Sequence, residues 1–280
     1  MRNISRDTRI GLALGGGAVL GAAHIGVLRA TKEYDIPISC IAGTSIGAFV
    51  ASLFAFGKEW EEIRKIALNL RWLDISRISL SKYGLLSNKK LAEVIHDILG
   101  QVRFENARVP LAIIATDIST GERVVLKEGD VAASVMASTS IPGLFVPVEI
   151  EGRMLVDGGI TEIVPVSPLR EMGADIVLAV NLIAKHRHRR PENIIDVLMN
   201  SFSFALMNSM RVQLVEADIV IAPDLSAYNL IDTDQTPGLI EAGYSEAKAA
   251  LKDYDVLAKA KEQRGSGHAK DLISKGMILK

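Results

Sequence analysis

Short apolar runs alternate along the chain with longer segments in which apolar residues recur at helical spacing. The short runs predict buried strands at residues 9–15, 40–42, 110–118, 176–182 and 218–222. The periodic segments predict helices at residues 21–34, 48–54, 59–70, 87–99, 130–137, 192–215 and 236–252. Because strands and helices alternate, we expect an α/β fold in which helices cover both faces of a sheet.

Turn residues predict how the remaining strands pair. Residues 123–126 follow Thr120-Gly121 and are expected to pair with the strand before that turn. Residues 144–150 and 153–156 are expected to form a hairpin around Glu151-Gly152.

The helix expected over residues 87–99 has a signal at each end. Ser87 or Asn88 is placed to cap its N-terminus, and Gly100 ends it. Residues 71–86, just before it, have no clear periodicity, so we expect an irregular flap there.

Length and charge narrow the class of protein. The chain has 280 residues and a formal net charge of −1, which gives no argument for nucleic-acid binding. Its one cysteine, Cys40, lies in a predicted buried strand, so we expect neither an internal disulfide nor a cysteine metal cluster. With no apolar leader and no apolar span near ~20 residues, we expect a cytoplasmic protein that can still contact a membrane surface. We assign residues 7–255 to one domain and 256–280 to a charged, loosely ordered tail.

The stretch Gly43-Thr44-Ser45-Ile46-Gly47 connects a predicted strand to a predicted helix. It fits the G-x-S-x-G pattern, in which a nucleophilic Ser lies on a strained, exposed turn. Gly43 and Gly47 suit this turn because side chains there would collide with the strand and the helix. The alternative is a tight turn with Ser45 as a helix cap, since the pentapeptide also recurs by chance.

A nucleophilic serine needs a base, and the histidines are poorly placed for that role. His24 lies in an apolar helix, where a core position is expected, and His96 lies in an amphipathic helix. His186 and His188 belong to a basic loop, and His268 to the tail. None follows a strand as the histidine of a Ser–His–acid triad would.

Asp157, in contrast, ends a predicted strand and precedes Gly158 and Gly159. A carboxylate with an ordinary pKa of ~3.9 is a weak base, so Asp157 must be partly desolvated to take a proton from a serine. The alternative is a turn residue, since Asp-Gly is a common turn dipeptide. Sequence spacing alone does not pair Asp157 with Ser45.

Gly15-Gly16-Gly17 ends the first predicted strand and offers backbone N–H groups with no side chain in the way. Such a loop suits an oxyanion hole. A dinucleotide-binding loop is the alternative, but Gly15, Gly17 and Gly21 miss the G-x-G-x-x-G pattern because the third glycine comes one residue late.

Four motifs, in order along the chain, resemble those of the patatin-like phospholipases. They are the run from Leu12 to Leu28, Gly43-Thr44-Ser45-Ile46-Gly47, the run from Ala137 to Gly143, and Val156-Asp157-Gly158-Gly159. The similarity extends from about residue 9 to about residue 250.

That resemblance implies a three-layer α/β/α fold with a mostly parallel central sheet. It implies a Ser–Asp dyad without histidine, with Ser45 as nucleophile and Asp157 as base. The oxyanion hole would lie at Gly15, Gly16, Gly17 and Ala18, with Gly43 and Gly47 forming the turn around the nucleophile. The implied activity is hydrolysis of fatty-acyl esters of phospholipids or related lipids, with no metal and no other cofactor.

Two positions depart from the family's pattern. Leu20 stands where the family usually carries Arg, and Glu162 where Asn is common. Leu20 removes a guanidinium that could brace the glycine loop or meet an anionic headgroup. It motivates an alternative function, a catalytically weak regulator that binds lipid or a partner; a Ser–His–acid hydrolase is a third interpretation.

Two further segments have alternative interpretations. The basic loop at residues 185–190 could meet anionic headgroups at the rim of the site, or be an ordinary solvated loop. The next helix is rich in Met and Phe, which favours core packing over an acyl-chain wall; these residues are Met199, Phe202, Phe204, Met207 and Met210.

Overall fold

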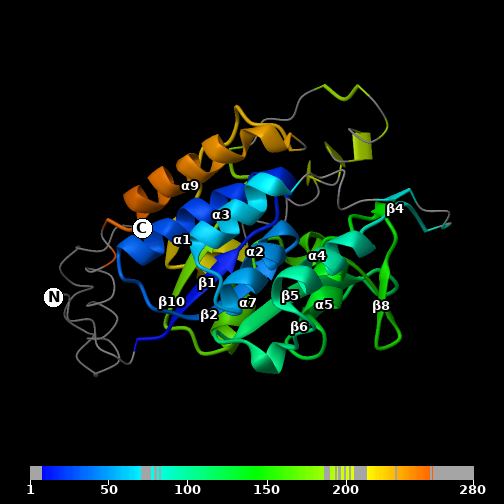
Figure 1. The fold of residues 1–280 in the computed structure, drawn as a ribbon, viewed down its shortest axis with the longest axis horizontal. Helices are drawn as coiled ribbons and strands as arrows, with labels where there is room; N and C mark the ends of the chain where they lie inside the picture. Colours follow the sequence, from blue (N-terminus) through cyan, green and yellow to red (C-terminus); the bar gives the residue numbers. More distant parts are fainter. Residues whose placement is uncertain are drawn as a thin grey trace.

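The computed structural model describes residues 8–70, 77–78, 81, 83–185, 190–192, 194, 197–198, 200–201, 203–204, 213–230, 232–252 and 254. The tail expected over residues 256–280, residues 186–189 of the basic loop, and most of the helix expected over residues 192–215 lie outside this set. Figure 1 shows a central sheet with helices packed on both sides.

In the described part of the chain, eight strands form the central sheet in the order β11-β10-β1-β2-β5-β9-β8, with β6 paired to β5 off this path. The pairs from β11 to β5 are parallel, whereas β6 and β9 pair with β5, and β8 with β9, in antiparallel fashion. The strands are β1 Ile10–Leu14, β2 Ile38–Thr44, β5 Leu111–Asp117, β6 Arg123–Leu126, β8 Val148–Ile150, β9 Arg153–Asp157, β10 Ile176–Val180 and β11 Ile219–Ile221.

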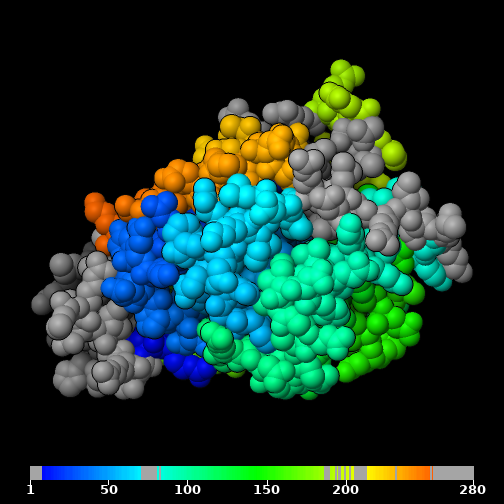
Figure 2. Space-filling view, in the orientation of Figure 1, coloured from blue at the N-terminus to red at the C-terminus, as the bar shows by residue number. Residues whose placement is uncertain are grey.

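Helices cover both faces of this sheet, as expected for an α/β fold. They are α1 Ala23–Glu33, α2 Ile46–Ala55, α3 Trp60–Asn69, α4 Lys89–Leu99, α5 Val131–Ser138, α6 Gly159–Glu162, α7 Ser167–Glu171 and α9 Thr236–Ala250. Figure 2 shows one face, formed by α9 (orange), α1 and α3 (blue to cyan) and α4 (green-cyan). Short 3-10 helices add η1 Ala18–Ala22, η3 Phe104–Asn106, η4 Leu214–Glu216 and η5 Thr233–Gln235.

Side chains of β1 separate the core into two layers because successive residues of a strand point to opposite faces. Leu12 and Leu14 pack with α1 and α2 in the larger apolar cluster. Ala13 points the other way, into a cluster with Leu169 of α7. The prediction of a three-layer α/β/α fold with a mostly parallel sheet is confirmed.

One predicted hairpin arm is wrong in detail. The strand expected over residues 144–150 is two strands in different sheets, since β7 (Gly143–Phe145) pairs with β4 (Gly84–Ser87) and β8 pairs with β9. Pro147 lies between them, and a proline has no N–H with which to continue a ladder. The Glu151-Gly152 hairpin, formed by β8 and β9, is confirmed.

The segment before α4 is also more regular than expected. Of the flap at residues 71–86, the described part includes β3 (Arg77–Ile78) and β4, which pair in antiparallel fashion. At the start of α4, Asn88 occupies the capping position, but its side chain makes no capping hydrogen bond. Gly100 ends α4 with φ 79°, a conformation that glycine adopts easily.

Candidate active site

Ser45 lies at the connection between β2 and α2, with φ 55° and ψ −127°. This is a strained conformation for a residue with a side chain, and such strain persists only where neighbouring structure imposes it. The two glycines explain how the turn closes. An added Cβ at Gly43 would lie 2.5 Å from the Ala48 Cα, and one at Gly47 would lie 2.1 Å from the Leu14 carbonyl oxygen.

A hydroxyl from α5 holds the backbone of this turn. The Ser45 N–H donates to the Ser138 Oγ at 2.8 Å, and Ser138 donates its own proton to the Ile114 carbonyl at 2.6 Å. The bond uses the Ser45 N–H, so that group is not available to a substrate oxygen. Ser138 lies in the third quoted motif, but its role could not be inferred from its place in the sequence.

Asp157 is the last residue of β9 and is 1% exposed. Its Oδ1 accepts the Gly159 N–H at 2.8 Å. Its Oδ2 is buried without a hydrogen bond of ordinary geometry in the described part of the chain. Burial raises the pKa of Asp157 to about 6, against the lowering effects of the nearby Ser45 hydroxyl and the Gly159 N–H. The fold therefore brings the Asp157 carboxyl to Ser45, a pairing that sequence spacing left open.

The segment that follows Asp157 connects three parts of the site. The Thr44 hydroxyl, beside Ser45, donates to the Glu162 carbonyl at 2.8 Å. The Gly16 N–H, from the glycine loop, donates to the Ile163 carbonyl at 3.0 Å. The backbone of Glu162 and Ile163 therefore ties the nucleophile turn and the glycine loop to the segment that carries Asp157.

Glu162, one of the two departures from the family pattern, has a buried carboxylate. That carboxylate pairs with the Arg123 guanidinium at 2.6 Å and accepts the Ser167 N–H at 3.0 Å. Its side chain is 5% exposed, against 34% for Arg123. These contacts anchor α6 to β6 and α7, so the side chain of Glu162 has a structural role while its carbonyl meets Thr44.

The glycine loop runs beside Ser45, since an added Cβ at Gly16 would lie 3.3 Å from the Ser45 Cβ. Two of its four N–H groups are already used: Gly15 donates to the Val180 carbonyl at 3.1 Å and Gly16 to that of Ile163. The N–H groups of Gly17 and Ala18 have no acceptor among the described residues. These two are the donors that remain for an oxyanion.

The two described histidines take no part in the pocket at Ser45. His24 is fully buried, and its Nε2 donates to the Gly15 carbonyl at 2.8 Å. This hydrogen bond holds the glycine loop to the helix that carries His24. Burial lowers its pKa to about 4, so His24 is neutral at physiological pH. His96 lies on α4, 3.7 Å from the Asp130 carboxylate.

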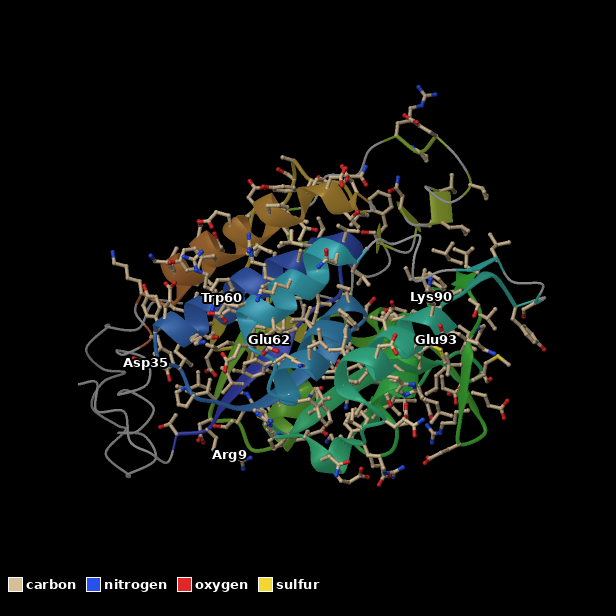
Figure 3. All side chains as sticks on the ribbon, viewed as in Figure 1. Arg9, Asp35, Trp60, Glu62, Lys90 and Glu93 are labelled. Atoms are coloured by element: carbon tan, nitrogen blue, oxygen red, sulfur yellow. The ribbon has the colours of Figure 1, made fainter. Side chains whose placement is uncertain are left out.

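An apolar pocket opens at Ser45. Its polar lining residues are Ser45, Asn88, Thr139, Thr233 and Thr236. The rest of its lining is glycine or apolar: Ala18, Val19, Gly21, Ala22, Ile25, Ile46, Phe49, Val50, Ile63, Ala67, Leu70, Leu91, Ile141 and Phe145. Two amphipathic helices form part of the wall, and their exposed sides carry Glu62 of α3 and Glu93 of α4, both labelled in Figure 3. Such a pocket suits a long apolar group.

Leu20 does not line this pocket. Its side chain is fully buried in the larger apolar cluster. The departure at this position therefore leaves Ser45, Asp157 and the pocket lining in place.

The described residues hold neither a cluster of metal ligands nor a helix fit to span a membrane. No group of three or more His, Cys, Asp or Glu side chains there is placed to hold a metal ion. None of the helices in that part of the chain combines the length and apolarity needed to cross a bilayer.

Most of the site lies in a region of the chain that is similar to a known protein family. The model of the family described as patatin-like phospholipase matches residues 12–170. This range contains Ser45, Asp157 and the glycine loop. Thr233 and Thr236 of the pocket wall lie beyond it.

Curated relatives are similar over nearly two thirds of the chain. An uncharacterised NTE family protein of Mycobacterium tuberculosis is 38% identical over 181 residues, which cover 64% of this chain and 50% of that protein. A lysophospholipase of Pyricularia oryzae is 34% identical over 182 residues, covering 62% of this chain and 12% of that protein. The matched region thus spans half or less of these relatives.

A solved structure shows the same fold. The crystal structure of VipD from Legionella pneumophila superimposes with a TM-score of 0.52 at 15% identity, over 88% of this chain and 67% of that one. At that identity the likeness concerns the arrangement of helices and strands alone.

Proposed function

We propose that this chain, which belongs to the patatin-like phospholipase family, hydrolyses fatty-acyl esters of phospholipids or related lipids. Ser45 is the nucleophile, Asp157 the base, and the N–H groups of Gly17 and Ala18 the oxyanion donors. The names of relatives, a lysophospholipase among them, support a lipid ester as substrate.

One observation carries this proposal: the buried Asp157 carboxyl, whose Oδ2 has no hydrogen-bond partner elsewhere in the described residues, lies beside the Ser45 hydroxyl on a strained turn. A buried polar atom without a partner costs about 1–3 kcal/mol, so its presence needs a reason. A proton acceptor for the Ser45 hydroxyl is such a reason. The pKa of about 6 supports this role, because the carboxylate is ionised at neutral pH yet more basic than an exposed one.

The first half-reaction forms an acyl-enzyme. The Ser45 Oγ attacks the ester carbonyl carbon while its proton moves to Asp157 Oδ2, and the carbonyl oxygen becomes an oxyanion held by Gly17 and Ala18. Collapse of this intermediate breaks the bond to the alcohol oxygen. The alcohol takes the proton from Asp157 and leaves.

The second half-reaction uses water. Water attacks the Ser45 acyl ester and gives a proton to Asp157, and a second oxyanion forms in the same place. Its collapse releases the fatty acid, and Asp157 returns the proton to Ser45. The apolar pocket holds the acyl chain through both steps, with its ester at Ser45. We propose that the substrate is drawn from a lipid surface by peripheral contact.

A fluorophosphonate probe tests the activated serine directly. Wild-type protein should be labelled at Ser45, and Ser45→Ala should not be labelled. The rate of labelling of Asp157→Asn should be lower than that of wild type by a factor of about 100 or more. Matched controls are Ser52→Ala, a buried serine of α2, and Asp117→Asn, a buried aspartate of β5. Both controls should keep wild-type labelling and hydrolysis of a fatty-acyl ester.

A folded wild-type protein that neither reacts with the probe nor hydrolyses any acyl ester would contradict this function. Binding of lipid vesicles by such a protein would support the regulator suggested by Leu20. Loss of labelling in a variant of an individual histidine that remains folded would instead favour a Ser–His–acid site.

A further inference from the structure

Asn88 is a buried side chain at the wall of the pocket that contains Ser45. It is 4% exposed and occupies the capping position of α4. An asparagine there usually accepts an N–H of the first helical turn, but Asn88 makes no such bond. Its amide is turned away from its own helix.

The orientation of this amide follows from its neighbours. Its Nδ2 lies 2.8 Å from the Met136 carbonyl oxygen, 3.2 Å from the Thr139 Oγ1 and 3.1 Å from the Ser140 Oγ. A carbonyl oxygen can only accept, so the nitrogen of Asn88 must face Met136. The Oδ1 must then point the other way.

That Oδ1 has no hydrogen-bond partner in the described part of the chain, and it is not among the polar atoms sealed inside the protein. Asn88 and Ser45 line the same apolar pocket, and because its nitrogen is engaged, the Asn88 amide has only this oxygen left to offer there. The hydroxyls of Thr139 and Thr236 are satisfied, since they donate to the carbonyls of Val135 and Thr233. Asn88 thus adds an unused hydrogen-bond acceptor to a largely apolar wall.

The position is also close to the proposed base. Ser140, which contacts the Asn88 nitrogen, accepts the Asp157 N–H through its carbonyl at 2.9 Å. The Asn88 side chain is therefore connected through Ser140 to the backbone of Asp157, and it lines the same pocket as Ser45.

We propose that Asn88 determines substrate specificity by accepting a hydrogen bond from a hydroxyl on the alcohol part of the substrate. An acyl chain carries no donor, so the donor must lie on the alcohol, next to the bond that is cleaved. This inference rests on the proposed function and defines its substrate class: acyl esters of polyols that keep a free neighbouring hydroxyl. A fully acylated or deoxy alcohol leaves the Asn88 oxygen buried and unpaired, which penalises its binding.

Three esters of one fatty acid test the proposal. They are the 1-monoester of glycerol, the monoester of propane-1,3-diol, which lacks the middle hydroxyl, and the glycerol ester with a methoxy group in its place. Wild-type kcat/KM should be about five- to tenfold higher for the glycerol ester than for either other compound, the size expected for one neutral hydrogen bond. The methoxy group accepts but does not donate, so it separates donation from polarity.

Asn88→Leu should reduce this preference to within about twofold of unity. The ratio is measured within each variant, so partial unfolding of Asn88→Leu cancels from it. Thr233→Val, which changes another polar residue of the pocket wall, is the matched control and should keep the preference.

Equal rates for the three esters with wild-type protein, or a preference that persists in Asn88→Leu, would overturn the proposal. If Asn88→Leu does not fold, the comparison of the three esters with wild-type protein tests the proposal, and equal rates overturn it. If the proposed function itself is wrong, the wild-type protein will hydrolyse none of the esters and the probe will not label Ser45. That result would overturn both the proposed function and the role of Asn88.

Discussion

The Ser138 hydroxyl bridges the Ser45 N–H, at 2.8 Å, and the Ile114 carbonyl, at 2.6 Å. One side chain of α5 thereby connects the nucleophile turn to β5. Because Ser45 has a strained backbone, the bond that holds its N–H contributes to keeping the side chain at the pocket.

Ser138→Ala should therefore lower both stability and reactivity. It leaves the Ser45 N–H and the Ile114 carbonyl without their bonds, which we expect to cost about 1–3 kcal/mol. Chemical denaturation measures this loss, and probe labelling of the folded protein should slow. Ser134→Ala, which removes a buried hydroxyl that donates to the carbonyl of Asp130, the N-cap of α5, is the control and should keep wild-type labelling.

The rate of acylation should depend on the ionisation of Asp157. A base must be deprotonated, and burial raises the pKa of Asp157 to about 6. We expect kcat/KM for a neutral ester to rise tenfold per pH unit below this value and to level off above it. A profile that is flat from pH 5 to pH 8 would contradict Asp157 as the base.

Asp157→Asn should make the protein more stable at neutral pH while it lowers activity. The folded pKa of Asp157 lies above its ordinary value of 3.8, so folding favours the protonated form. Stability therefore falls as pH rises from about 4 to about 6, and above that range the free energy of unfolding is lower by the full amount, about 3 kcal/mol. The melting temperature of Asp157→Asn should exceed that of wild type at pH 8, and the difference should shrink toward pH 4.

Glu162→Ala should lower the stability of the protein more than it lowers the rate at which the folded protein is labelled at Ser45. It leaves the Arg123 guanidinium without its buried partner, which we expect to cost about 1–3 kcal/mol, given that Arg123 is partly exposed. The Glu162 carbonyl that meets Thr44 belongs to the backbone and remains. Labelling per folded molecule should stay within about threefold of wild type, and a much larger loss would give the carboxylate a direct role in the site.

His24 should matter for the glycine loop without acting as a base. His24→Ala removes the donor to the Gly15 carbonyl and leaves a cavity, so we expect a loss of about 2–4 kcal/mol in unfolding free energy. His24→Gln can still donate and should recover part of it. The pH profile of the folded variants should keep its midpoint near 6, whereas a shifted midpoint would implicate the imidazole in proton transfer.

Much of the fold follows from local patterns in the sequence. The apolar runs and helical periodicities predicted β1, β2, β5, β10 and the helices α1 to α5, because burial of these segments is decided by their own side chains. The strand expected over residues 144–150 failed where Pro147 interrupts it. There the choice between two sheets depends on partners distant in the sequence.

The sequence by itself determined which residues have the chemistry of the site. Ser45 between two glycines, Asp157 before two glycines and the loop at Gly15 are visible as motifs, because each needs a particular local backbone. Only the tertiary structure decided how these parts are used. It brought Asp157 to Ser45, engaged the N–H groups of Gly15 and Gly16, and placed Asn88 in the wall of the pocket. Hydrogen bonds and burial between distant segments depend on packing, which no single stretch of sequence encodes.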